Sequence, residues 1–107
     1  MRIGFDVSQT GKNKAGCGYF AQSLIETLLQ QGADHTFILY PHFGTTYWDP
    51  DARHSTLRPN SPNSSRKVVG ANYADSISFW KHIPPNGEDK LGNPDIVHSN
   101  NFSCPKP

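Results

Sequence analysis

The sequence predicts an α/β fold, an open parallel sheet flanked by helices. Two observations predict it. The first is the order of the first forty residues, in which an apolar stretch, a glycine-spaced turn, an amphipathic stretch and a second apolar stretch follow one another. The second is another apolar stretch, which precedes His98. That order is typical of the opening βαβ unit of a Rossmann-like sheet, in which ligands bind at the loop after the first strand. We expect residues 1–107 to form one such domain, truncated before the sheet is complete.

The first strand and the first helix carry the clearest patterns. A strand is predicted over Ile3–Val7, because apolar residues recur there at every second position. A helix is predicted over Tyr19–Gln31, because its apolar residues gather on one wide face, and Gly32 follows it as a natural C-cap. That face consists of two adjacent rows, Phe20, Leu24 and Leu28 in one and Ala21, Ile25 and Leu29 in the other.

The rest of the chain alternates short apolar segments with turn-forming residues. A second strand is predicted over Thr36–Tyr40, a continuous apolar run that suits a strand covered on both faces. Residues 41–66 are predicted to form an irregular loop, with at most one short element near Trp48, because no period is sustained there. We expect three later elements: a strand over 67–69, a helix over 76–82 that ends at Pro84-Pro85-Asn86-Gly87, and a strand over 94–98.

Composition argues against several classes of protein. Ten Lys and Arg residues oppose nine Asp and Glu residues, for a net charge of +1, and no basic block suggests a nucleic-acid surface. No stretch approaches the ~20 apolar residues of a membrane span, and the N-terminus does not have the pattern of a secretory leader. We therefore expect a cytoplasmic protein in which Cys17 and Cys104 are reduced thiols, and in which the Asn63 and Asn101 glycosylation sequons are chance matches.

Two segments, taken together, resemble the N-terminus of family 4 glycosyltransferases. The first is Arg2–Val7 followed by Gly16-Cys17-Gly18-Tyr19-Phe20 and then by leucines at 24 and 28. The second is 94–105, a strand that ends in a histidine and is followed by a loop of small residues, an Asn-aromatic pair and a proline. The order and the spacing of the two segments are also similar to those of the family, whereas residues 41–93 show little resemblance.

The resemblance implies the GT-B fold, in which two Rossmann-like domains face each other across a cleft. In that family the N-terminal domain mainly receives the acceptor, and the C-terminal domain binds the nucleotide-sugar donor. The sugar is transferred with retention of configuration, usually without a metal ion. The resemblance thus implies that this chain is the N-terminal portion of such a transferase, inactive alone, with a nucleotide sugar as co-substrate and no other cofactor. Its acceptor would be a glycan, a lipid or a similar molecule, and contact with the inner face of the membrane would be peripheral.

Gly16 and Gly18 are candidate substrate-binding residues between the first strand and the first helix. Their backbone N–H groups could approach a phosphate or a sugar at the positive end of the helix. Alternatively, they permit a tight turn and close packing of the helix on the sheet. Their spacing is not that of a dinucleotide fingerprint, and the Lys-Ser/Thr pair of a P-loop is absent. The nearby carboxylate of Asp6 is expected to accept N–H bonds from the loop.

His98 is the candidate catalytic residue, because it ends the last predicted strand at the edge where α/β sites form. Its imidazole could bond a sugar hydroxyl and change protonation near neutral pH, or be tied to a neighbouring carbonyl. Asn100, Asn101 and Phe102 would line the cleft beside it, although Phe102 suits simple packing equally well. Several family members carry a second histidine where this chain has Asn100, which can donate a hydrogen bond but cannot act as a base. The other histidines lack metal-ligand spacing, so no metal site is predicted.

Two further hypotheses stay open at this point. In the first, the chain is a non-catalytic binding module, either a degenerate stub of the same fold or a subunit that pairs with a separate donor-binding chain. In the second, it is an unrelated flavodoxin-like or receiver-type domain. That class would need further strands and acidic or phosphate-binding loop residues that the sequence does not offer.

Overall fold

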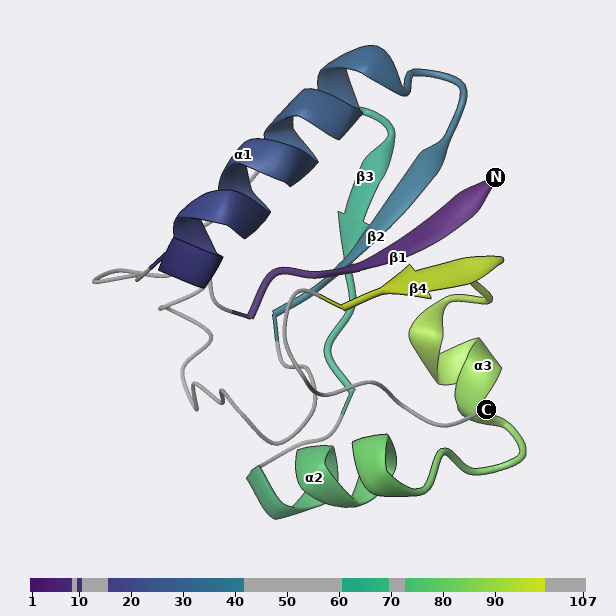
Figure 1. The fold of residues 1–107 in the computed structure, drawn as a ribbon. Helices are drawn as coiled ribbons and strands as arrows, with labels where there is room; N and C mark the ends of the chain where they lie inside the picture. Colours follow the sequence, from purple (N-terminus) through teal and green to yellow (C-terminus); the bar gives the residue numbers. More distant parts are fainter. Residues whose placement is uncertain (9, 11–15, 42–60, 70–72, 100–107) are drawn as a thin grey trace.

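The computed structural model describes residues 1–8, 10, 16–41, 61–69 and 73–99 (Figure 1). Within them, one sheet contains four parallel strands in the order β3-β2-β1-β4. The strands are β1 (Arg2–Asp6), β2 (Thr36–Tyr40), β3 (Ser64–Arg66) and β4 (Ile96–His98), and the helices are α1 (Gly16–Gln31), α2 (Tyr73–Lys81) and α3 (Gly87–Leu91). The predicted α/β class is confirmed, and the all-parallel sheet is consistent with a Rossmann-like fold.

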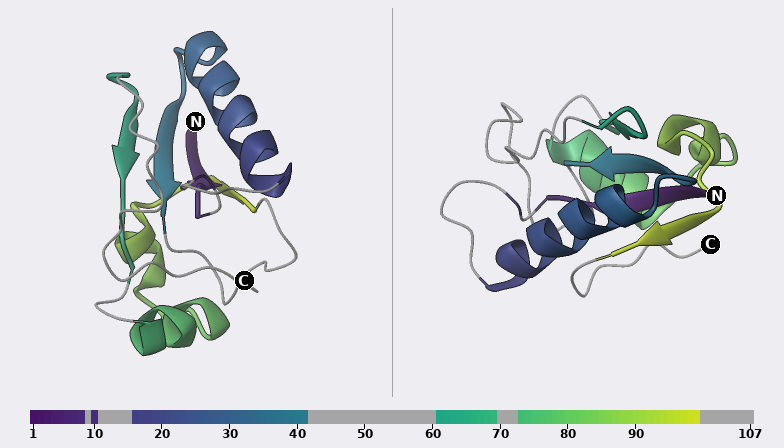
Figure 2. Two further views of the ribbon diagram at one scale, coloured as in Figure 1. Left: turned by 90° about the vertical axis from the view of Figure 1, so that its left-hand side faces the viewer. Right: turned by 90° about the horizontal axis from the view of Figure 1, so that it is seen from above.

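Helices cover both faces of the sheet, with α1 on one side and α2 and α3 on the other (Figure 2). The side chains of β2 alternate between the two layers. Phe37 and Leu39 pack toward α1, whereas Ile38 and Tyr40 pack toward α2 and α3. A parallel strand that is buried on both faces needs apolar residues at consecutive positions. The bounds predicted for this strand are therefore confirmed without change.

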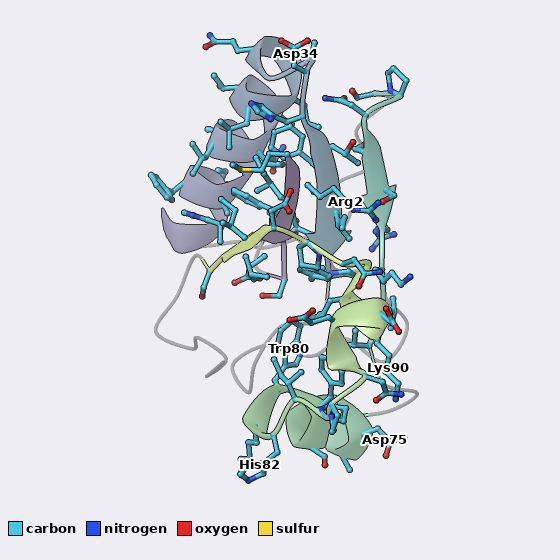
Figure 3. The ribbon with its side chains drawn as sticks, turned by 90° about the vertical axis from the view of Figure 1, so that its right-hand side faces the viewer. Arg2, Asp34, Asp75, Trp80, His82 and Lys90 are labelled. Carbon is cyan, nitrogen blue, oxygen red and sulfur yellow. The ribbon has the colours of Figure 1, made fainter. Side chains whose placement is uncertain are left out.

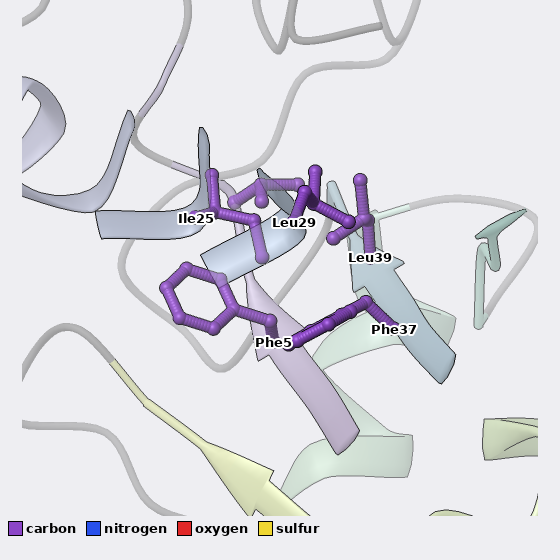
Figure 4. Close-up of a cluster of buried hydrophobic side chains, with 6 residues drawn as sticks. Phe5, Ile25, Leu29, Phe37 and Leu39 are labelled. Atoms are coloured by element: carbon purple, nitrogen blue, oxygen red, sulfur yellow. The ribbon is translucent and has the colours of Figure 1, made fainter. Parts of the chain in front are cut away.

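The core on the α1 face is a layer of side chains between the helix and the two central strands. Phe5 and Phe37, each 1% exposed, lie against Ile25 and Leu29 of α1 (Figure 4). The helix presents these residues at successive turns, so that one row points directly at the sheet. Each of these core side chains contributes roughly 1.5–3 kcal/mol through burial.

The second apolar row of α1 is less buried than its periodicity predicts. Leu24 and Leu28 are half-buried and pack against the edge of the core, but Phe20 is 60% exposed. Phe20 therefore belongs to the predicted apolar face of the helix but not to the core. The row of Ala21, Ile25 and Leu29 faces the sheet, so the neighbouring row contacts it only from the side.

Tyr40 anchors the core on the opposite face. Its ring is fully buried, and its hydroxyl donates a hydrogen bond of 2.6 Å to the backbone carbonyl of Leu91. Burial raises the pKa of the Tyr40 phenol, and the nearby Arg2 guanidinium offsets this only in part. The phenol therefore stays protonated and remains a donor. Gly4 of β1 lies beneath the ring, where an added Cβ atom would be 2.6 Å from Tyr40 Cε2.

The third strand lies earlier in the chain than predicted. It spans Ser64–Arg66 instead of 67–69, inside the range expected to be a loop. Within the described part of the chain, β3 is an edge strand that pairs only with β2, so it can be polar. Its pairing continues into the next residue, because the N–H of Lys67 donates to the Leu39 carbonyl at 2.9 Å. The rest of the predicted loop, 42–60, lies outside the described residues.

The helices also depart from their predicted bounds. α1 begins at Gly16, before Tyr19, and α2 spans Tyr73–Lys81 in place of 76–82. A short helix that was not predicted, α3, follows the two prolines and begins at Gly87. α3 ends at Gly92, whose φ of 86° lies in the left-handed region that favours glycine.

The amino ends of β1 and β4 are held together by a pair of residues distant in sequence. The backbone N–H of Arg2 donates to Asp95 Oδ2, and the N–H of Asp95 donates to the Arg2 carbonyl, each at 2.7 Å. The Arg2 guanidinium also donates to the carbonyl of Gly92. These bonds align β4 on β1 in parallel register, with Phe5 opposite His98.

Asn63 joins the end of α1 to the start of β3. Its Nδ2 atom donates to the carbonyls of His35 at 3.1 Å and Gly32 at 3.4 Å, and its own carbonyl accepts from the Phe37 N–H at 2.8 Å. Ser61 Oγ donates to its Oδ1 atom. The amide nitrogen that an N-linked glycan would occupy is thus engaged in the fold.

We expect Asn63→Ala to destabilise the domain by about 1–2 kcal/mol, since part-buried carbonyls lose their donor. The measurement is urea unfolding followed by circular dichroism. Asn86→Ala is the matched control, because Asn86 is exposed and its side chain makes no capping bond to α3. Equal midpoints for the two variants would contradict this role of Asn63.

Candidate functional site

The strand order locates the candidate site at one edge of the sheet. The chain passes from β1 outward to β2 and β3, and it then returns to add β4 on the other side of β1. The direction of winding therefore reverses between β1 and β4. In open α/β sheets, ligands bind beyond the carboxyl ends of the strands at such a reversal. His98 ends β4 at that edge, and the turn of Val7 and Ser8 follows β1 there. Figure 1 shows that α1 also begins on this side of the sheet.

His98 is placed by the pairing of β4 with β1. The strand ends at this residue, as the sequence predicts, and Phe5 is its Cα partner on β1. The imidazole stacks on the phenyl ring with 4.9 Å between ring centroids and 14° between ring planes. The side chain of His98 is exposed, whereas Phe5 belongs to the core. One face of the imidazole thus rests on the core while the residue remains open to solvent.

The turn after β1 is built by three buried polar residues. Asp6 Oδ1 accepts hydrogen bonds from the Ser8 backbone N–H at 2.9 Å and from Ser8 Oγ at 2.6 Å. Thr10 Oγ1 donates to the carbonyl of Val7 at 2.7 Å. All three polar side chains are 1% exposed. The expectation that the Asp6 carboxylate accepts a loop N–H bond is confirmed, and these bonds hold the turn that follows β1.

Ser8 and Thr10 were not among the predicted site residues. The signal for Ser8 was present, because an aspartate followed two residues later by a serine is a common turn pattern. Thr10 is held by bonds to a residue three positions earlier, since both its Oγ1 atom and its backbone N–H donate to the Val7 carbonyl.

Gly16 is the first residue of α1, and it is exposed. A Cβ atom added there would meet no atom within 4 Å, so helix–sheet packing does not require glycine at this position. Gly18, in contrast, is buried. The first N–H groups of a helix have no partner within it and carry partial positive charge. The first turn of α1 is therefore suited to binding an anion or a hydroxyl oxygen.

Some of the predicted site residues lie outside the part of the chain that the structure describes. Asn100, Asn101 and Phe102, predicted to line the cleft beside His98, lie outside the described residues, as does the glycine loop from 11 to 15. Within the described ranges, no cluster of three His, Cys, Asp or Glu side chains could hold a metal ion. None of the helices in those ranges is long and apolar enough to cross a membrane.

The fold and the site define a class of protein, an α/β domain with a candidate ligand site at the reversal point of a parallel sheet. That site combines an exposed histidine, a buried Asp-Ser turn and the start of a long helix. Among known proteins, the chain matches no family model, no curated protein and no solved structure. The likeness to family 4 glycosyltransferases therefore depends on the two sequence segments.

Proposed function

We propose that this chain is the acceptor-side, N-terminal portion of a retaining glycosyltransferase of family 4 with the GT-B fold. In this proposal a sugar passes from a nucleotide-sugar donor to a glycan, a lipid or a similar acceptor. The observation that carries it is the position of His98, an exposed imidazole at the reversal point of the sheet. A neutral imidazole has one N–H donor and one acceptor nitrogen, which suits a sugar hydroxyl.

Each part of the proposed site has a separate task. His98 would form a hydrogen bond to the acceptor hydroxyl and orient it. Holding the reacting oxygen in place raises the rate of the transfer. The first turn of α1, from Gly16 to Gly18, would face the donor phosphates with its N–H groups. Asn100, Asn101 and Phe102 would complete the acceptor side. A donor-binding domain would supply the nucleotide sugar across the cleft, and this chain alone would not turn over.

Saccharide binding tests this proposal without requiring turnover. The experiment is a protein NMR screen of the methyl glycosides of glucose, galactose and mannose. We expect at least one of them to shift the NMR signals of residues at the start of α1 and at the end of β4. His98→Ala should weaken that binding about tenfold, because one hydrogen bond is worth roughly 1–1.5 kcal/mol.

His82→Ala serves as the control for loss of an imidazole. His82 is exposed and points away from the sheet beside α2 (Figure 3). Its replacement should leave saccharide binding unchanged. Equal affinity of the wild-type protein and His98→Ala for every bound glycoside would contradict the assignment of His98 to the acceptor.

A non-catalytic subunit of the same fold is the second candidate, and one observation favours it. Among the described strands β4 lies at the edge of the sheet, and its residue Ile96 is 51% exposed. An edge strand offers backbone groups to another strand, and a separate donor-binding chain could use them. Co-purification with such a chain would favour this candidate, whereas a strictly monomeric protein that binds no saccharide would count against it.

A further inference from the structure

We infer that Phe5 is a positioning residue, which holds the imidazole of His98 in one orientation at the edge of the sheet. The use of that orientation in acceptor binding rests on the proposed function. The orientation itself follows from the contacts between β1 and β4. Phe5, a residue in the middle of the core, would thus have a role at the candidate site.

The contact is made by two residues with opposite surroundings. Phe5 is 1% exposed and is packed among the core side chains of α1 and β2, including Ile25 and Phe37. His98 is exposed at the carboxyl end of β4. Their rings are nearly parallel, at 14°, with centroids 4.9 Å apart. The phenyl ring is thus a fixed platform, and the imidazole is the group that it orients.

The pairing register explains why this contact forms. β4 lies parallel to β1, with Ile3 opposite Ile96 and Phe5 opposite His98. Side chains at paired positions of neighbouring strands lie on the same face of the sheet. Val97, between the two, packs against the core on the other face. A shift of one residue in the register of β4 on β1 would turn His98 away from Phe5. The hydrogen bonds at the amino ends of the two strands fix that register and so maintain the stacking of His98 on Phe5.

Stacking restricts the imidazole in a way that suits a hydrogen-bonding role. An exposed histidine on an unsupported strand end would exchange among several rotamers. With one face on Phe5, the two ring nitrogens are confined to a plane parallel to the phenyl ring. Ordering the imidazole before the ligand arrives lowers the entropy lost on binding. A protonated imidazole would also be attracted to the phenyl face.

Phe5→Leu tests the inference, and Phe37→Leu is the matched control. Both variants remove a buried phenyl ring from the same core cluster, but only Phe5 stacks on His98. In the full chain, the carbon-bound imidazole protons of His98 should show an upfield ring-current shift by NMR. We expect that shift to be lost in Phe5→Leu and kept in Phe37→Leu. Equal loss in both variants, or no change in either, would overturn the inference.

One further measurement keeps the inference testable if Phe5→Leu does not fold, and a second separates it from the proposed function. In the wild-type protein, nuclear Overhauser contacts between the Phe5 ring protons and the His98 imidazole protons should be observed, and their absence would overturn the inference. For a methyl glycoside that binds, Phe5→Leu should weaken affinity at least threefold more than Phe37→Leu. If the Overhauser contacts are present but no glycoside binds, the positioning stands and the glycosyltransferase proposal fails.

Discussion

Replacing Gly4 with alanine should destabilise the domain by about 3 kcal/mol, since it adds a methyl group to a filled space. The added Cβ atom would lie 2.6 Å from Cε2 and 2.8 Å from the hydroxyl oxygen of Tyr40. Tyr40 cannot move aside easily, because its ring is fully buried and its hydroxyl is bonded to the Leu91 carbonyl. Displacing the ring would leave that buried carbonyl without its donor, which adds to the cost of the overlap.

The measurement is the midpoint of urea unfolding, with Gly16→Ala as the control. Gly16 has no atom within 4 Å of an added Cβ, so that variant should change stability by less than about 1 kcal/mol. A double variant, Gly4→Ala with Tyr40→Leu, should lose less stability than the sum of the two single variants, because the smaller side chain relieves the overlap. Strict additivity would show that the overlap is not the cause.

Removing the indole of Trp80 should cost about 4 kcal/mol, within the range for a large buried aromatic side chain. Trp80 is 4% exposed, and it meets Tyr40 and Phe79 edge-to-face, with ring centroids 5.8 Å and 5.3 Å away. Figure 3 shows it reaching from α2 toward the sheet, whereas Asp75 lies on the outer side of the helix. Trp80→Ala would thus leave a cavity between α2 and the sheet.

Trp80→Phe and Ser78→Ala complete this experiment. The phenylalanine variant keeps an aromatic ring and should lose less than half as much stability as the alanine variant. Ser78 is exposed on the same helix, and its replacement should have little effect. The measurement is thermal unfolding by circular dichroism. A small loss for Trp80→Ala would mean that α2 contributes little to the core.

Elements with strong local patterns could be predicted from the sequence. β2 has the predicted bounds because a strand that is buried on both faces is apolar throughout. β3 could not be found from its own residues, because Ser64–Arg66 is polar and forms a strand only through its bonds to β2. α3 has only five residues, too few to show a helical period. The exposure of Phe20 depends on how much of α1 the sheet covers, which periodicity does not reveal.

In the candidate site, too, the features that depend on local sequence could be predicted, and those that depend on distant contacts could not. The position of His98 at a strand end could be predicted, because β4 has an apolar pattern that stops there. The Asp6–Ser8 turn joins residues two positions apart, so it too lies within reach of sequence reasoning. The stack of His98 on Phe5 depends on the register between two strands far apart in the chain, which no local pattern encodes.

The bonds between Arg2 and Asp95 have a consequence for how quickly the protein folds. These residues are 93 positions apart, and the central strand β1 pairs with β4 only through contacts of that range. Proteins rich in such distant contacts fold slowly, because the chain loses much entropy before the contacts form. During synthesis, β1 is made almost ninety residues before its second neighbour, β4. An N-terminal half-sheet of β1, α1 and β2 would therefore persist in the nascent chain with one side of β1 unpaired, a natural point of contact for a chaperone.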